Sequence, residues 1–148
     1  MRRVRWKSYT WRCDRGTVVF ELPEGWYSVS EDSIISFSSA SQQSALTIAV
    51  YADPPLTFEA IERHILERRP FGDSRGRSER AGIPNQAGYV EEFRSRRDDR
   101  EVDWVVHFLF FGFATVIASV NSTLNEMATD RPTFDEILNS IRLVAPTK

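Results

Sequence analysis

Short runs of apolar and β-branched residues recur along most of the chain, separated by Gly, Pro, Asp and Ser. Runs of this length that are bounded by turn residues are typical of β-strands. They predict strands over residues 9–12, 17–22, 34–38, 45–51, 88–96, 102–111 and 114–121. Short turns join consecutive strands, so we expect the sheet to be antiparallel.

The stretch from 102 to 122 differs from the others because it is apolar on both faces of its predicted strands. One face of the first strand carries Trp104, Val106, Phe108 and Phe110. The other face carries Val105, Leu109 and Phe111. An antiparallel sheet with one solvated face would alternate apolar and polar residues, so both faces must be covered here. Either one helix lies on each face, or both helices share a face and a partner covers the other.

Charged and aromatic residues predict the register of the hairpin that turns at Asp98-Asp99. One register places Arg94 opposite Asp103 and Phe93 opposite Trp104. Opposite charges and aromatic pairs directly across a ladder each contribute roughly 0.2–1 kcal/mol. A slip of one residue would lose both pairs at once, so we expect this register.

The next hairpin turns at Gly112-Phe113. These residues suit a two-residue type II′ turn, in which the glycine supplies a positive φ. The turn pairs Phe108 with Ile117 and Val105 with Val120.

Helical spacing appears first after Thr57, which can serve as an N-cap. Phe58, Ile61 and Ile65 recur at helical intervals. The helix should end before Pro70, because a residue that precedes proline avoids the α region.

A second helix is predicted to begin at Thr133, which forms a capping box with Glu136. Its apolar side chains are Phe134, Ile137, Leu138 and Ile141. The expected fold class is therefore α+β, with an antiparallel sheet of about six strands flanked by two main helices. We expect one domain, residues 1–148, in which residues 1–8 form a basic N-terminal extension.

The composition is ordinary for one globular domain and narrows the possible functions. The chain has 148 residues, of which 41% are hydrophobic and 27% charged. A formal net charge of -2 gives no overall field that favours nucleic acid or an anionic membrane. No apolar segment follows the basic start, and no window reaches the ~18 apolar residues of a membrane span. We therefore expect a cytoplasmic protein with neither a nucleic-acid nor a membrane partner.

Residues suited to catalysis or metal binding are sparse. His64 and His107 fall in separate predicted elements, and no carboxylate follows either at ligand spacing. Cys13 is the single cysteine, which excludes an internal disulfide, and it has no neighbouring histidine that would activate its thiol. We therefore expect no enzyme, no cofactor and no metal.

Glu91 is the titratable residue that the register places beside aromatic side chains, on the face of Tyr89 and Phe93. A buried, unpaired carboxylate is costly and often functional. The alternative, which we favour, is that this strand is an exposed edge. A catalytic pair of Glu91 with His107 would need a deep pocket that holds both side chains.

Two motifs resemble the PsbP/Mog-like superfamily. Residues 20–26 (FELPEGW) resemble its opening pattern F-x-L-P-x-G-W, and residues 134–142 (FDEILNSIR) resemble its closing helix, F-x-x-I-L-x-S. The predicted elements between them follow the family's order, so the resemblance spans about residues 17–143. It implies an antiparallel sheet flanked by helices, and it carries no catalytic residues.

The resemblance also implies protein binding as the general role. The superfamily includes photosystem subunits, nuclear-transport cofactors, bacterial DcrB-like proteins and the Eag chaperones of type VI secretion effectors. Eag chaperones are cytoplasmic and similar in length, and they shield apolar transmembrane segments of effectors on their sheet. The basic N-terminal extension and the arginine-rich middle loop of this chain depart from the Eag pattern.

Our hypothesis is a non-catalytic protein-binding domain, a chaperone or adaptor for a secreted effector. Aromatic side chains on a desolvated patch commonly supply most of the energy of an interface. The expected partner-binding residues on one sheet face are Trp104, Val106, Phe108, Phe110 and Ile117. The same face would also suit a homodimer. The alternative is an immunity protein that binds a toxin through arginine-rich loops at 71–80 and 94–100.

Overall fold

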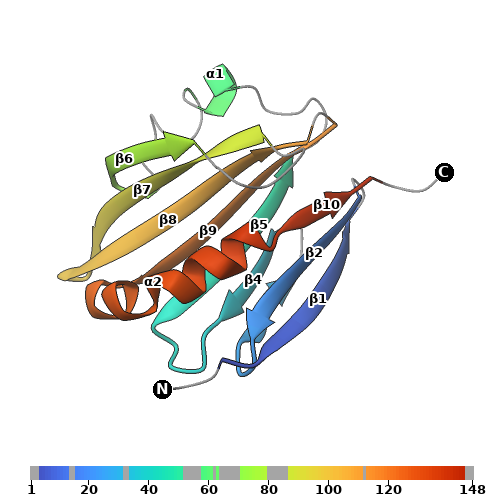
Figure 1. Ribbon diagram of the computed structural model, residues 1–148. Coiled ribbons are helices and arrows are strands. Elements are labelled where there is room, and N and C mark those ends of the chain that lie inside the picture. The colour runs from blue at the N-terminus through green and yellow to red at the C-terminus, as the bar shows by residue number, and fades with distance from the viewer. Residues whose placement is uncertain are drawn as a thin grey trace.

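The computed structural model describes residues 4–13, 16–31, 34–51, 58–61, 63, 71–79, 87–111 and 113–145. The elements in these ranges are β1 (Trp6–Cys13), β2 (Gly16–Pro23), β3 (Tyr27–Glu31), β4 (Ile34–Ser38), β5 (Ser44–Tyr51), α1 (Phe58–Ile61), β6 (Asp73–Glu79), β7 (Ala87–Arg97), β8 (Arg100–Phe110), β9 (Thr115–Thr123), α2 (Leu124–Asn139) and β10 (Arg142–Val144). They form two antiparallel sheets (Figure 1). The smaller sheet has the order β1-β2-β10, and the larger has the order β3-β4-β5-β9-β8-β7-β6.

The three-stranded sheet and α2 lie over one face of the seven-stranded sheet (Figure 1). We call this the near face and the opposite one the far face. Alternate residues of β2 point into the core between these layers, because Val18, Phe20 and Leu22 are buried while Thr17 and Val19 are only half-buried. The seven-stranded sheet contributes Ile35, Phe37, Leu46, Ile48, Val105, Leu109, Val116, Ala118 and Val120, and α2 contributes Met127, Phe134, Ile137 and Leu138.

The predicted fold class, a sheet of about six strands flanked by two main helices, is wrong. The described residues are mostly strand, form two sheets and contain a single long helix. The prediction missed β3 and β10, which are short, and β6, which is charged and has no apolar side chain. Of the first predicted helix, the described parts are the four-residue α1 and Arg63, and the rest lies outside the described residues. β1 begins at Trp6, so residues 6–8 of the predicted N-terminal extension belong to a sheet.

The second predicted helix exists, but it begins at Leu124 rather than after Thr133. Its N-cap is Thr123, whose Oγ1 accepts a hydrogen bond from the Glu126 backbone N–H at 3.3 Å. Thr123-x-x-Glu126 is itself a capping-box pattern. Pro132, directly before the predicted start at Thr133, lies inside the helix.

The predicted register of the central hairpins is confirmed. Arg94 pairs with Asp103 and Phe93 with Trp104. The turn residues Asp98 and Asp99 have φ values of 47° and 63°, and two positive φ values are the requirement of a type I′ turn.

The following hairpin also has the predicted pairs, Phe108 with Ile117 and Val105 with Val120. The Phe111 N–H donates to the Ala114 carbonyl at 2.9 Å across the turn. Gly112 lies outside the described residues, so the type of this turn stays a prediction.

Candidate protein-binding face

The far face can be followed across the sheet as rows of paired residues. One row runs from Ile34 through Ala49, Ile117 and Phe108 to Tyr89. A neighbouring row runs through Ser36, Thr47, Ser119, Val106 and Glu91 to Arg77. Both rows begin with small or exposed side chains on β4 and β5 and end with large or charged ones on β8, β7 and β6. The far face is therefore divided into two unlike halves.

The half on β7, β8 and β9 is a compact aromatic cluster. Its buried members are Tyr89, Phe93, Trp104, Val106, Phe108 and Ile117, and we call this set the far-face cluster. The rings of Tyr89 and Phe108 stack with centroids 4.6 Å apart. Phe71 packs on Phe93 and Trp104, with both centroid distances 5.2 Å. Trp104 Nε1–H donates to Ser95 Oγ at 2.9 Å, so the indole has a partner for its polar edge.

The five predicted partner-binding residues all lie on this half. Trp104, Val106, Phe108 and Ile117 belong to the far-face cluster, and Phe110 packs against it. In the chain by itself the first four are buried and Phe110 is half-buried. Their shared face is thus as expected from the sequence, whereas their contact with a partner stays a prediction.

The half on β3, β4 and β5 is open. Tyr27, Ile34 and Tyr51 are 44%, 41% and 39% exposed, and we call these three residues the rim. Small side chains such as Ser36 and Thr47 lie between them and are half-buried. Sequence reasoning missed the rim. Laying the two predicted strands 34–38 and 45–51 side by side would have shown that one face has only small or polar residues between Ile34 and Tyr51.

Glu91 contradicts the exposed edge that we favoured for β7. β6 pairs along the outer side of β7, and Glu91 is only 3% exposed. Arg77 of β6 donates from Nε to Glu91 Oε1 at 2.6 Å, and its guanidinium lies 4.8 Å from the centre of the Tyr89 ring. A buried carboxylate with such a partner has a structural explanation.

The structure also separates the residues considered for catalysis. His107 is buried on the near face between Val90 and Ala118, whereas Glu91 lies on the far face. No acid–base pair can assemble from side chains on opposite faces of one sheet. Cys13 is half-buried with Sγ 3.4 Å from the Gly16 carbonyl oxygen, and His64 lies outside the described residues. Over the described ranges, no three His, Cys, Asp or Glu side chains are grouped so that they could hold a metal ion.

The arginine-rich segments that we expected to be loops are largely paired strands. Residues 73–79 form β6, and 94–97 belong to β7. Arg94 donates from Nε and Nη2 to the two carboxylate oxygens of Asp103, at 2.7 and 3.1 Å, and this hydrogen bonding raises the pKa of Arg94. The immunity-protein alternative placed the toxin contact on loops at 71–80 and 94–100, and the strand pairing of these segments does not favour it.

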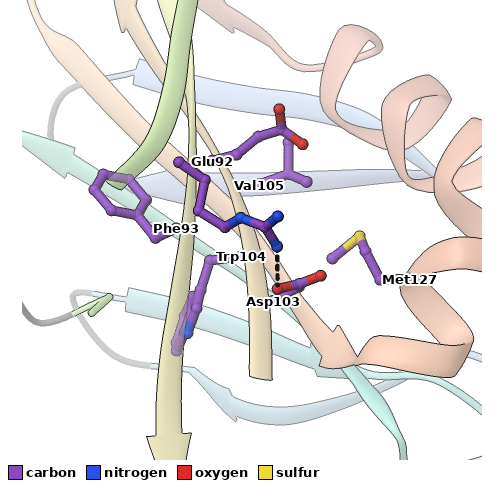
Figure 2. Close-up of a pocket in the computed structure, with 7 residues that line it drawn as sticks. Glu92, Phe93, Asp103, Trp104, Val105 and Met127 are labelled. Carbon is purple, nitrogen blue, oxygen red and sulfur yellow. Dashed lines mark ion pairs between the residues drawn. The ribbon is translucent and has the colours of Figure 1, made fainter. Parts of the chain in front are cut away.

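A pocket of about 170 Å³ lies where these arginines meet α2. Figure 2 shows Asp103 and Met127 on one side of the sheet and the rings of Phe93 and Trp104 on the other. The pocket is lined on the near face by Arg75, Glu92, Asp103, Val105 and Met127.

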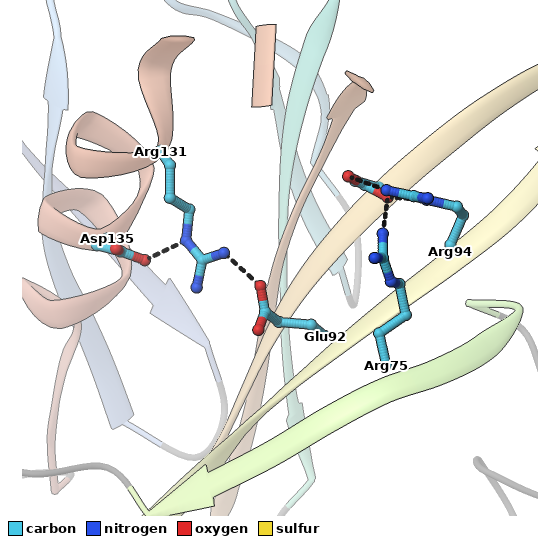
Figure 3. Close-up of polar contacts among 6 residues, drawn as sticks. Arg75, Glu92, Arg94, Arg131 and Asp135 are labelled. Atoms are coloured by element: carbon cyan, nitrogen blue, oxygen red, sulfur yellow. Dashed lines mark hydrogen bonds and ion pairs between the residues drawn. The ribbon is translucent and has the colours of Figure 1, made fainter. Parts of the chain in front are cut away.

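Arg131 of α2 ties the helix to the sheet beside this pocket (Figure 3). It donates to Glu92 at 2.5 Å and to Asp135 at 2.8 Å. Burial lowers the pKa of Arg131, but the hydrogen bonds to Asp135 and Glu92 outweigh it and leave the pKa raised.

Comparison with known proteins gives structural matches without a family match. No family model and no curated protein matches the chain. CyanoP, the cyanobacterial PsbP of Synechocystis sp. PCC 6803, is 14% identical with a TM-score of 0.65 over 94% of this chain and 92% of its own. PA94 of Pseudomonas aeruginosa, a protein of unknown function, is 17% identical with a TM-score of 0.61 over 95% and 99%. The Ran-binding protein Mog1p of Saccharomyces cerevisiae is 10% identical with a TM-score of 0.58 over 95% and 97%.

At these identities the likeness shows the fold alone, and the fold is PsbP/Mog-like. The two motifs that resemble the superfamily meet in the core, where the rings of Trp26 and Phe134 pack edge to face with centroids 6.3 Å apart. Placement in the DcrB-like or Eag branch stays a prediction. Of the helices among the described residues, neither is long and apolar enough to cross a membrane.

Proposed function

We propose that this chain is a non-catalytic protein-binding domain that holds its partner on the far face. The observation that carries the proposal is the division of that face. The three large side chains of the rim are exposed, although Ala49, Ile117 and Phe108 on the row of Ile34 are buried. Exposed apolar side chains that gather on one face of a folded domain mark a candidate interaction site.

The rim and the far-face cluster supply different parts of an interface. Ile34 shares a row with Ile117 and Phe108, so a segment seated on the rim would lie directly beside the cluster. The small side chains Ser36 and Thr47 let a partner backbone approach the sheet closely. In this proposal the rim makes the first contact, with the half-buried Phe110 beside it, and the buried Trp104, Val106, Phe108 and Ile117 lie behind this surface.

The partner class that suits this face is another protein with an apolar segment. A chaperone or adaptor for a secreted effector would use the face to shield such a segment from water, which removes apolar area from solvent at roughly 25 cal/mol per Å². Mog1p, which has the same fold, is a Ran-binding protein, and this supports protein binding as the general role. We carry over neither its partner nor its binding residues.

The test is a quantitative pull-down from the native host with three versions of the chain. The wild type is compared with Tyr27→Ser/Ile34→Ser on the rim and with Val144→Ser, an exposed apolar residue of the three-stranded sheet. We expect one protein to be enriched by the wild type and the Val144 variant, and to fall about 10-fold or more with the rim variant.

Two results would overturn the proposal. Equal retention by all three versions would mean that the rim is not the contact surface. A second copy of this chain as the rim-dependent species, seen as a concentration-dependent dimer in sedimentation, would replace the adaptor role with self-association.

A further inference from the structure

The near-face pocket has a feature that neither packing nor the proposed function explains. Arg75 lines the pocket with a side chain that is 48% exposed, and its described contact is an ion pair with Asp103 Oδ1 at 3.8 Å. That distance is too long for a hydrogen bond. Asp103 already accepts two hydrogen bonds from Arg94, so its charge is compensated without Arg75.

A β-bulge aims Arg75 into the pocket. The pairing of β6 with β7 shifts between Ser74 and Gly76, which leaves Arg75 as the extra residue beside Glu92. Bulges commonly re-aim a side chain near functional sites. Gly76 has a φ of 152°, which favours glycine, and a Cβ there would meet nothing within 4 Å. The backbone conformation of the bulge, and not close packing, therefore favours glycine at this position.

The rest of the pocket has a fixed arrangement. Glu92 is held by Arg131, and Asp103 is held by Arg94. Val105 and Met127 are buried and form an apolar part of the lining. A ligand therefore meets a half-exposed guanidinium, whose described contact is one long ion pair, beside a short apolar surface.

We propose that this pocket binds a carboxylate on a short aliphatic stem, with Arg75 as its recognition residue. The planar fork of a guanidinium matches the two oxygens of a carboxylate. Val105 and Met127 contact the methylene groups. The carboxylate comes either from a small free acid or from an acidic side chain of a bound protein, and the near-face position makes this site independent of the far-face proposal.

The test is a titration of the isotope-labelled full chain followed by NMR, with propionate as the small acid and propionamide as its uncharged match. We expect saturable shifts at the Arg75 side chain, Val105 and the Met127 methyl with propionate only. Arg75→Gln should weaken binding about 10-fold, as the loss of a hydrogen bond to a charged group does. Arg96→Gln, an exposed arginine of the same hairpin, is the matched control and should leave binding unchanged.

A second arm separates the two sources of the carboxylate. An end-blocked Gly-Glu-Gly peptide is compared with its Gln counterpart. Tighter binding of the Glu peptide than of propionate assigns the site to a partner's acidic side chain, and weaker binding assigns it to a free acid. Absence of saturable shifts with both acids, or equal binding by the wild type and Arg75→Gln, overturns the proposal.

Discussion

The two faces of the seven-stranded sheet are covered to different extents. On the near face, α2 and the three-stranded sheet cover the apolar residues, and the core runs from β2 across to β8. On the far face, the buried far-face cluster occupies only the β7–β9 half, and the rim leaves Tyr27, Ile34 and Tyr51 exposed. The rim places three of the exposed apolar side chains on the half-open side of this sheet, and that is where we propose that a partner binds.

The largest loss of unfolding free energy should come from creating a cavity in either buried cluster. Phe20→Ala removes a β2 ring that packs in the core over the near face and is 1% exposed, and Phe108→Ala removes a far-face ring that is 0% exposed. Each should lower the free energy of unfolding by about 3–5 kcal/mol in urea titrations, because a cavity is left behind.

Comparing the unfolding free energies of these two variants shows whether the far-face cluster is as well packed in the isolated chain as the near-face core. A cost below about 1 kcal/mol for Phe108→Ala, with the full cost for Phe20→Ala, would mean that the far-face cluster is not closed in the isolated chain.

A smaller loss of unfolding free energy is expected when the ion pair beside the far-face cluster is broken. Arg77→Met leaves the buried Glu91 carboxylate without its partner and should cost about 1–3 kcal/mol of unfolding free energy. Glu91→Met combined with Arg77→Met should recover part of this loss, since no charge then stays buried. A double variant less stable than Arg77→Met would contradict this account, and the four proteins of the cycle are measured by chemical denaturation.

The start of α2 gives a prediction of about 1 kcal/mol. Thr123→Ala removes the N-cap hydrogen bond to Glu126 and should cost that amount. Thr133→Ala is the matched control, because that residue lies inside the helix, where alanine costs nothing in propensity. A larger loss of stability for Thr133→Ala than for Thr123→Ala, seen as a lower thermal midpoint, would indicate that the helix begins at Thr133.

The sequence was informative wherever side chains pair directly across strands. Arg94 with Asp103 and Phe93 with Trp104 defined one register, and only that register satisfied both pairs. The sequence did not reveal elements that lack an alternation of apolar and polar residues. β6, with the sequence DSRGRSE, pairs only on one side and was taken for a loop, which led to the wrong edge for the sheet and the wrong environment for Glu91.

The candidate site could be predicted only in part, for a related reason. Periodicity placed Trp104, Val106 and Phe108 on one face, but it could not show what covers them. Strand order decides that question, and it depends on contacts between segments far apart in the chain. The rim became visible only after β3, β4 and β5 were placed side by side.

The smallest effect on stability should come from the rim itself. Tyr27→Ser and Ile34→Ser replace exposed side chains and should each change the free energy of unfolding by less than about 0.5 kcal/mol. A loss of 2 kcal/mol or more would mean that these residues are part of the core, and the rim would no longer be a surface for a partner.

The far face as a docking surface is tested most directly by site-specific photo-crosslinking in the native host. A photoreactive phenylalanine analogue replaces Tyr27 in one strain and Val144 in another. We predict a single crosslinked protein from position 27 and none of the same mass from position 144. The same adduct from both positions, or an adduct from position 144 alone, would contradict the account.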